Sequence, residues 1–509
     1  MNHEWTDNEG MDYPWVSDQG DGTFRNPVLQ ADYSDPDVIR HGDDFWMVAS
    51  SFTATPGLPI LHSRDLVNWT IVNHAIKNVP HPRYREVQPG CGVWAPSIRL
   101  HDKKFWIFFP MPDEGIYVTC ADDPAGEWSE PWCLAEAKGW IDPCPFWDDD
   151  GTAWLFHAYA NSRAGIKDRI HMRPMKPDCS SLLPEECHEL IYAPHHPYLE
   201  GPKVHKINSW YYIMAPGGGV PQGWQVAFRS RNLKGPYEEK VVLEKGSTPI
   251  NGPHQGALVD LPNGEWWFMH FQDSGPYGRL AHLQPVQWED GWPLMGVDFD
   301  GNGIGEPVPA WRNPGVVVPG IVTVPQTSDE FTSPKLGLQW QWQANHEETW
   351  CSLIARPGWL RMYAQPSAGA DLGRTPALLM QKFPARTFSV ETLFECSGET
   401  AGLAIVGGGE HVSLALVAGR FVLQINGHIH CTMPAPNGPV RLRVTVDNNA
   451  TCTFSHAAAT GAFTNIAPAF QARHGGWMGA KVGLFCFSNG HADFAYFRFA
   501  SGTERNFGR

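Results

Sequence analysis

The sequence predicts an all-β protein in which a five-bladed β-propeller precedes an antiparallel β-sandwich, and three observations carry that prediction. A unit made of a polar turn, an aromatic pair and a strand recurs five times within the first 310 residues. A stretch rich in Pro, Val and Gly then follows, with the composition of an extended linker. Beyond the linker, apolar and polar residues alternate with period two between Gly and Asn turns, which is typical of a sandwich.

The repeated unit has a spacing that indicates propeller blades. Its copies read HGDDFWMVAS, HDKKFWIFFP, DDDGTAWLFHAY, INSWYYIMAP and LPNGEWWFMHF. We take the second aromatic residue of each copy, or its equivalent, as the reference: Trp46, Trp106, Trp154, Tyr211 and Trp267. These reference residues are separated by 60, 48, 57 and 56 positions. Short strands at this period, with little helical periodicity, favour five blades. An irregular all-β domain with chance recurrence of Trp-rich strands is the alternative, and five concordant copies weigh against it.

The change in sequence pattern sets the predicted domains. We expect the propeller over residues 1–315, the linker over 316–326 and the sandwich over 327–509. The 23 Trp fit this reading, because Trp is frequent in repeated β-folds and in sites that stack ring-shaped ligands such as sugars.

Charge and composition bear on partners and compartment. The net charge of −16 and the lack of a cluster of Lys or Arg argue against nucleic acid and anionic membranes as partners. No run of 18 apolar residues occurs, and the N-terminal stretch does not resemble a secretion signal. The 11 cysteines contain no C-x-x-C pair, which is typical of reduced thiols. These features predict a cytoplasmic protein.

The repeat places five residues at equivalent positions in successive blades, and we call this position the shared address. The first strand of a propeller blade lines the central channel, and the aromatic pair lies on the next strand. Residues 11 to 13 positions before each reference aromatic are therefore expected to converge near the axis, and they are Asp35, Ala95 (beside Trp94), Asp142, Glu200 and His254. Asp37 lies two positions after Asp35, on the same side of the strand, and remains an alternative to it.

Three carboxylates in a Trp-lined pocket suggest acid–base chemistry. Mutual repulsion raises the pKa of at least one of them, so one protonated acid and one ionised base can coexist. Hydrolysis of a glycosidic bond needs this pair. Taken singly, each residue would be read as a turn or strand-edge residue, and the shared address is what favours the catalytic reading.

With these residues in place, the chain resembles glycoside hydrolase family 43, the five-bladed propellers that hydrolyse β-xylosides and α-L-arabinofuranosides. The resemblance rests on NPVLQADYSDPDVIR, WAPSIR, WIDPCPFW, LEGPKVHK, GPHQGALV and GRLAHLQPVQW. SDEFTSPKLGLQWQWQ is similar to the start of the concanavalin-like sandwich that follows the propeller in the family's β-xylosidases. Where many of these enzymes carry a GGT segment, this chain has APGGGVPQGWQ, so that subsite wall is expected to differ.

The resemblance implies a role for each matching position. Asp35 corresponds to the general base, Asp142 to the residue that orients the acid and tunes its pKa, and Glu200 to the general acid. The resemblance further implies that His254 lies near the bottom of the pocket as a substrate-binding residue, and that Arg279 hydrogen-bonds to the sugar or to the acid. We expect Trp94 and Phe52 to contact the sugar as well. An ordinary packed loop aromatic is the alternative for Phe52.

The predicted function is an inverting, exo-acting β-xylosidase that acts on xylo-oligosaccharides. Inversion requires roughly 6.5–9.5 Å between acid and base, so that a water molecule fits. An α-L-arabinofuranosidase, or an enzyme with both activities, remains open. So do a propeller hydrolase of invertase or arabinanase type and a non-catalytic carbohydrate-binding propeller.

No cofactor is expected to be required, and the candidate metal is a calcium ion in the channel, contacted by His254 through water. Assembly into a homo-oligomer stays open. His195 and His196 are adjacent, and on an extended chain they would point to opposite faces, which argues against a shared metal.

Overall fold

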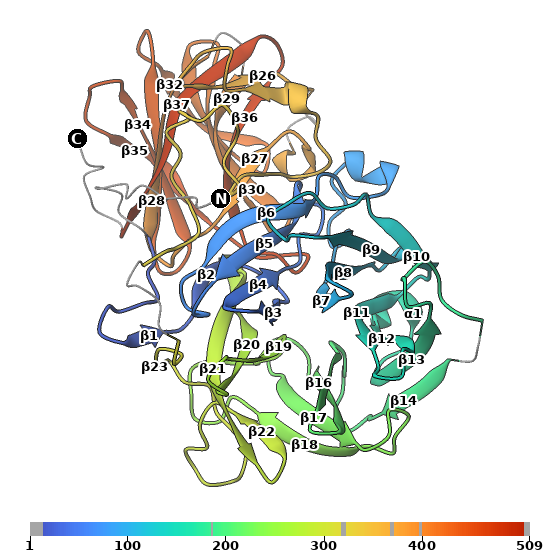
Figure 1. Cartoon of the computed structure of the whole chain (residues 1–509). Helices are drawn as coiled ribbons and strands as arrows, with labels where there is room; N and C mark the ends of the chain where they lie inside the picture. Colours follow the sequence, from blue (N-terminus) through green and yellow to red (C-terminus); the bar gives the residue numbers. More distant parts are fainter. Residues whose placement is uncertain (1–13, 185–186, 317–321, 367–370, 397–399, 503–509) are drawn as a thin grey trace. The chain divides into compact units, whose positions relative to one another are not determined.

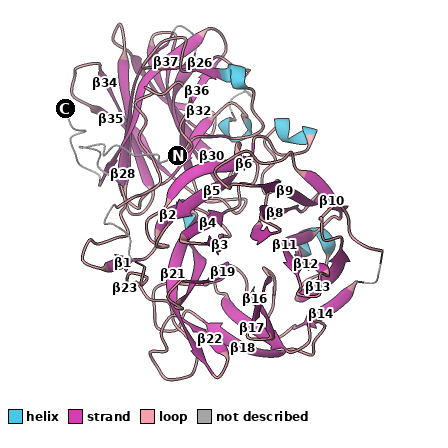
Figure 2. Cartoon of the chain, viewed as in Figure 1, coloured by secondary structure: helices cyan, strands magenta, loops and turns pink. Residues whose placement is uncertain are grey.

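The computed structural model describes residues 14–184, 187–316, 322–366, 371–396 and 400–502. Residues 1–13 and 503–509 of the predicted domains, and residues 317–321 of the predicted linker, lie outside this described part. The chain divides into two compact units, one of Ser17–Thr323 with Gly476–Met478 and the other built mainly on Val324–Gly475 and the residues from Gly479 onward. Strands dominate both units, and the helices are single turns (Figure 2). None of the helices in the described ranges has the length and apolar character needed to cross a bilayer.

The first unit is a five-bladed propeller (Figure 1). Its first two blades are the sheets β3(Asp37–His41)-β4(Asp44–Val48)-β5(Gly57–Ser63)-β6(Thr70–Ile76) and β7(Ser97–His101)-β8(Lys104–Met111)-β9(Gly115–Ala121)-β10(Trp132–Glu136). The next two are β11(Trp140–Trp147)-β12(Ala153–Tyr159)-β13(Arg169–Met175)-β14(His188–Tyr192) and β15(Lys203–Ile207)-β16(Trp210–Gly217)-β17(Trp224–Ser230)-β18(Glu238–Leu243). The five reference aromatic residues lie on the second strand of their blades, as the repeat predicts.

The fifth blade is completed by a strand from the beginning of the chain. Strands β19(His254–Asp260), β20(Trp266–Asp273) and β21(Arg279–Glu289) are followed in the sheet by β2(Leu29–Asp32), and β22(Trp292–Met295) also pairs with β21. A shared core reinforces this closure, because Leu29 packs in one apolar cluster with Phe45 of the first blade and Trp267 of the fifth. The ring is therefore closed by hydrogen bonds between its first and last segments.

Short elements connect the blades and the loops. A two-stranded sheet pairs β1(Thr23–Arg25) with β23(Ala310–Arg312). The helical turns of this unit are η1(Pro82–Arg85), α1(Asn161–Ala164) and η2(Gly275–Tyr277). Turn α1 follows β12 directly, and this connection brings it to the mouth of the channel in the third blade.

The second unit is a sandwich of two seven-stranded antiparallel sheets. One sheet has the order β24(Gln341–Trp342), β27(Leu379–Lys382), β36(Lys481–Phe487), β29(Thr400–Gly407), β30(Glu410–Val417), β31(Arg420–Ile425), β32(His428–Pro434). The other has the order β25(Cys351–Ser352), β26(Leu360–Tyr363), β37(His491–Ser501), β28(Phe388–Cys396), β33(Val440–Val446), β34(Thr451–Ala458), β35(Thr464–Gln471). Alternation along β33 buries Val440, Leu442 and Val444 and leaves the residues between them partly exposed. The predicted fold class is confirmed in both units.

Candidate active site

The shared address places side chains where the innermost strands begin. Asp35 lies two residues before β3, Glu200 lies three residues before β15, and His254 is the first residue of β19. Asp142 lies near the start of β11, where the pairing with β12 shifts register. Asp35 and Asp142 both have a φ of 55°, in the left-handed region that turns favour and extended strands avoid. The turn geometry suggested by the local Asp-Pro sequences therefore presents the carboxylates at the channel mouth.

Asp35 accepts hydrogen bonds from three side chains. The hydroxyls of Ser34 and Ser50 each donate to its Oδ2 at 2.6 Å. Nη1 of Arg279 donates to Oδ1 at 3.0 Å, and the carboxylate is almost entirely buried. A carboxylate that accepts two hydroxyls and a guanidinium is stabilised in its charged form and held in one orientation. A general base needs such a fixed orientation toward the water molecule that it activates.

Asp142 has a different environment. Burial raises its pKa, and the negative charge of Asp35 raises it further, against a lowering by the backbone N–H of Gly201. That N–H donates to Oδ2 at 2.8 Å. Gly201 has a φ of 60°, and a β-carbon there would lie 2.9 Å from the Gln255 side chain. A glycine is therefore required where the chain that carries Glu200 passes Asp142.

Glu200 is a carboxyl group whose surroundings favour its protonated form. Burial, followed by the charge of Asp142, raises its pKa well above the ordinary value, although Arg279 acts in the opposite direction. Its side chain is 22% exposed, so the group still reaches the cavity. An acid that keeps its proton at neutral pH can donate it to a leaving group.

His254 lies behind Glu200 instead of on the cavity wall. Its Nε2 is 3.5 Å from Oε1 of Glu200, and the ring is fully buried. Burial lowers the pKa of His254 to about 3, so the imidazole is neutral. It contacts the predicted acid, while its predicted contact with a sugar stays a prediction.

The three carboxylates line one cavity of about 220 Å³. This is below the roughly 300–1,000 Å³ of common ligand pockets, which suits a single sugar ring better than a polymer. Of the predicted sugar-binding residues, Phe52, Trp94 and Arg279 line it. Phe52 and Trp94 lie with ring centroids 6.5 Å apart and form an aromatic wall. Their roles in binding remain predictions.

Asp37, the alternative to Asp35, points elsewhere. Its Oδ2 accepts from Nη1 of Arg99 at 2.6 Å and from the backbone N–H of Ile98 at 2.8 Å. The ammonium of Lys203 lies 3.7 Å away, and the carboxylate is 1% exposed. Asp37 is thus part of a buried ion cluster that packs the channel, and it is absent from the cavity lining.

Comparison with known proteins identifies the family. The model of glycosyl hydrolases family 43 matches residues 24–293, and the model of the beta xylosidase C-terminal concanavalin A-like domain matches residues 328–500. The chain belongs to glycosyl hydrolases family 43. It is therefore a glycoside hydrolase with a carbohydrate substrate, and the predicted family and enzyme class are confirmed.

Relatives within this family cover most of the chain. A protein of Xylanibacter ruminicola is 38% identical over 92% of this chain and 86% of its own length. A protein of Formosa agariphila named beta-xylosidase is 38% identical over 70% of this chain and 65% of its own. A Bacteroides ovatus protein named non-reducing end alpha-L-arabinofuranosidase is 28% identical over 94% of both chains. The crystal structure of the family 43 protein BlXynB of Bacillus licheniformis aligns with a TM-score of 0.80 at 25% identity, covering 94% of this chain and all of that one.

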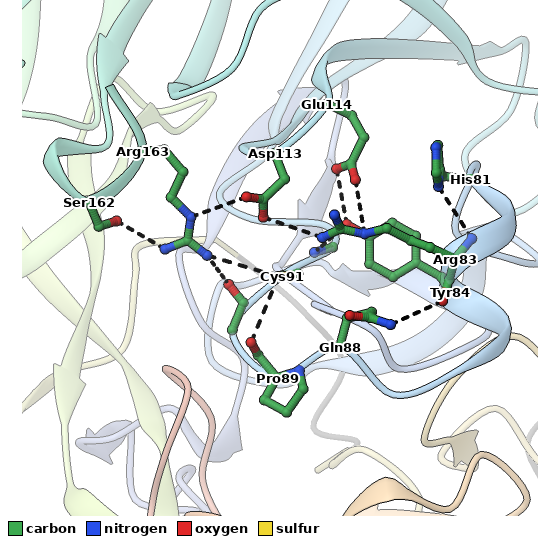
Figure 3. Close-up of polar contacts among 12 residues, drawn as sticks. His81, Arg83, Tyr84, Gln88, Pro89, Cys91, Asp113, Glu114, Ser162 and Arg163 are labelled. Carbon is green, nitrogen blue, oxygen red and sulfur yellow. Dashed lines mark hydrogen bonds and ion pairs between the residues drawn. The ribbon is translucent and has the colours of Figure 1, made fainter. Parts of the chain in front are cut away.

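Arg163, which lies over Trp94 of the aromatic wall, belongs to a polar network with Asp113 and Arg83 that Figure 3 shows. The guanidinium of Arg163 lies 5.0 Å from the ring centroid of Trp94, and its Nη2 donates to the carbonyl of Gly90 at 2.9 Å. Arg163 also pairs with Asp113 at 3.6 Å, and Asp113 in turn accepts from Arg83 at 3.4 Å. The arginine therefore holds a cation over the face of Trp94 and fixes the indole.

The surroundings of His254 offer few ligands to the predicted calcium ion. Neither ring nitrogen makes a hydrogen bond within the described part of the chain, so a water could donate to or accept from the ring. Calcium prefers six to eight oxygen ligands. The one group of three or more His, Cys, Asp or Glu ligands found among the described residues lies elsewhere. The residues present do not form a protein-ligated calcium site, and an ion held through water stays a prediction.

That other group consists of His195, His196 and Glu239. The two histidine rings were expected to point to opposite faces, and they do not. Nε2 of His195 lies 2.6 Å from Oε1 of Glu239, and Nε2 of His196 lies 3.5 Å from the same atom. Both rings reach one carboxylate because the segment is a turn, closed by a hydrogen bond from His196 N–H to the carbonyl of Ala193. However, the indole N–H of Trp224 donates to Nδ1 of His196, which leaves the proton of the neutral ring on Nε2. That nitrogen is then a donor to Glu239 and not a metal ligand.

Sequence reasoning missed several cavity residues. Gln255, next to His254, lines the cavity and hydrogen-bonds with Asp142. Turn α1 contributes Asn161 and Ser162, and the APGGGVPQGWQ segment contributes Val220. Tyr198 lies two residues before Glu200. The position of Gln255, one residue after the shared address, was the one available signal, because no motif marks the loop residues.

Proposed function

We propose that the protein is an inverting, exo-acting β-xylosidase that releases terminal xylose from xylo-oligosaccharides. One observation carries this proposal: the three carboxyl groups that line a single small cavity have different surroundings. Asp35 accepts hydrogen bonds from Arg279 and two hydroxyls, while burial and the charge of Asp142 raise the pKa of Glu200. The names of the family 43 relatives supply the sugar, since the Formosa agariphila protein is named beta-xylosidase.

The proposed reaction uses each group once. Asp35 takes a proton from a water molecule while the water oxygen bonds to the anomeric carbon. The bond from that carbon to the glycosidic oxygen breaks, and Glu200 gives its proton to the departing oxygen. Attack on the face opposite the leaving group inverts the anomeric configuration. Asp142 helps to keep Glu200 protonated, because its negative charge raises the pKa of Glu200.

The cavity size supports exo action. A space of about 220 Å³ accommodates a terminal ring, whereas internal cleavage needs an open groove for sugars on both sides. We therefore propose that the enzyme shortens oligosaccharides one residue at a time.

The test combines product analysis with a single substitution. Xylobiose and aryl β-xylosides should be hydrolysed, and NMR should detect α-xylose as the first product. Glu200→Gln should lower kcat on xylobiose by about 10²–10⁴-fold, since that is the usual contribution of a general acid. The loss on dinitrophenyl β-xyloside should be much smaller, because that leaving group departs without a proton. Equal losses on both substrates would remove the acid assignment, and β-xylose as first product would remove inversion.

An α-L-arabinofuranosidase is the second candidate, supported by the name of the Bacteroides ovatus relative. Both sugars are pentoses, so the same carboxylates serve either activity. The ratio of kcat/KM on nitrophenyl β-xyloside and nitrophenyl α-L-arabinofuranoside distinguishes the two, and a ratio below one would favour the arabinofuranosidase.

A further inference from the structure

Tyr198 is an exposed aromatic residue on the wall of the cavity. Its side chain is 48% exposed, unlike Phe52, which is 3% exposed. It lies two residues before Glu200, and both residues line the same cavity. An exposed large aromatic at a cavity beside the proton donor differs from a packed core residue, and its surface is available to a ligand.

The backbone of Tyr198 is held in an unusual conformation. Its φ is 59°, in the left-handed region that a bulky residue rarely adopts. The buried carboxylate of Asp168 accepts from its backbone N–H at 2.5 Å, and the carbonyl of Asp168 accepts from Ala193 at 3.1 Å. The carbonyl of the preceding residue, Pro197, accepts from the backbone N–H of Gly218 at 2.6 Å. Strained backbone held by such bonds is typical of residues that a function keeps in place.

The ring of Tyr198 is partly covered. The ammonium of Lys167 lies over it, 4.8 Å from the centroid, and also pairs with Asp168 at 3.7 Å. Gly219 also approaches the ring: a β-carbon added to this glycine would lie 3.7 Å from Cδ2 of Tyr198. Lys167 and Gly219 thus hold the ring in place while nearly half of the side chain stays uncovered.

The chemistry of the site decides which part of a substrate this ring would meet. Glu200 must protonate the oxygen between the terminal sugar and the sugar that leaves. The leaving sugar therefore lies on the Glu200 side of the cavity, next to Tyr198. An aromatic ring with a free surface can pack against the apolar C–H face of a sugar ring.

We propose that Tyr198 is the platform for the leaving sugar, so that it selects substrates by the group released and not by the terminal residue. This inference rests on the proposed glycosidase function and adds to it a residue that recognises the second sugar. Asp168 is a positioning residue, which acts through the backbone of Tyr198.

The experiment compares two substrates that share the terminal xylose. Xylobiose releases a sugar, whereas β-xylosyl fluoride releases a fluoride ion and places nothing against Tyr198. Tyr198→Ala should lower kcat/KM on xylobiose by about tenfold or more and leave kcat/KM on the fluoride within about twofold. Tyr198→Phe keeps the ring and should stay close to wild type on both. Asp168→Ala should shift the ratio in the same direction by a smaller factor.

Tyr192→Ala is the matched control, because Tyr192 is another exposed tyrosine, 55% accessible, that does not line the cavity. Its xylobiose-to-fluoride ratio should equal that of wild type. Equal losses of Tyr198→Ala on both substrates, or no loss on either, would overturn the platform. A failure of the proposed function is distinguishable, because wild-type protein would then hydrolyse neither substrate, and the inference would fall with it. Thermal melting of each variant verifies folding, and Tyr198→Phe tests the ring if Tyr198→Ala is unfolded.

Discussion

The propeller and the sandwich each bury carboxylates among β-strands, and they give those carboxylates different partners. In the sandwich, Asp493 accepts from Nε and Nη2 of Arg361 at 2.7 and 2.8 Å and from Arg356 at 2.9 Å. These bonds lower the pKa of Asp493, although burial alone would raise it. In the propeller, burial raises the pKa of Asp142, and an arginine bonds only to its neighbour Asp35.

The difference separates a carboxylate that stabilises a fold from one that can transfer protons. Asp493 is saturated by two guanidinium groups and stays ionised, so it contributes to stability and has no proton to exchange near neutral pH. Asp142 and Glu200 share a cavity in which their charges oppose each other, so ionising both is costly. Both units bury carboxylates. In the active site, Asp142 and Glu200 lack the arginine partners that offset the charge of Asp493.

The largest effect is expected from removing Asp35, the proposed base, whose carboxylate bonds to Arg279. Asp35→Asn keeps the size of the side chain but removes the base, so kcat on aryl β-xylosides should fall by about 10⁴-fold. Activated leaving groups should not restore the rate, because attack by water is impaired whatever departs. Asp260→Asn, a change at a partly exposed carboxylate of the same unit that does not line the cavity, is the control. A loss of less than about tenfold for Asp35→Asn would transfer the base role to another residue.

A smaller effect, with a distinct pH signature, is expected from Asp142→Asn. Because the charge of Asp142 raises the pKa of Glu200, its removal should lower that pKa. Glu200 must be protonated to act, so the alkaline limb of the kcat/KM profile should move to lower pH, with a loss of about 10–100-fold at the optimum. A pH–rate profile measures this shift. An alkaline limb that stayed in place would show that Asp142 does not tune the acid.

The smallest effect is expected in the sandwich and concerns stability alone. Asp493→Asn leaves two arginines without their carboxylate and should lower the free energy of unfolding by about 1–2 kcal/mol, with kcat unchanged. The folded pKa of Asp493 is depressed, so wild type holds this advantage above the unfolded pKa and loses it as the pH falls through the folded pKa. Thermal melting at neutral and acidic pH should show the two proteins converging. A drop in kcat at full stability would contradict a purely structural role.

The period of the repeat made the catalytic address predictable from sequence. A fixed spacing from the aromatic pair locates the start of each inner strand, so Asp35, Asp142 and Glu200 could be grouped without side-chain geometry. The choice between Asp35 and Asp37 could not be made in this way, since both face the same side. The positive φ of Asp35 and the bond from Arg99 to Asp37 decide it, and neither is visible in a pattern.

Loop contacts were beyond the reach of spacing rules. Asp168 holds the backbone of Tyr198, and Asp113 pairs with the side chain of Arg163, and both partners lie far away in sequence. The same limit explains the error at His195 and His196, where an extended chain was assumed and a turn is present. The closure of the fifth blade by β2 also carries no aromatic-pair signature, so the repeat could not reveal it.

Closure of the fifth blade by β2 joins residues that the ribosome synthesises first to residues that it adds much later. Asp35 follows β2 and is synthesised early, whereas its partner Arg279 emerges 244 residues later. The backbone N–H of Arg279 also bonds to Asp32, at the end of β2. The base can be locked in place only when the fifth blade arrives, so a nascent chain that ends before β21 can hold folded blades and still be inactive. Hydrolytic activity therefore reports that the ring has been completed.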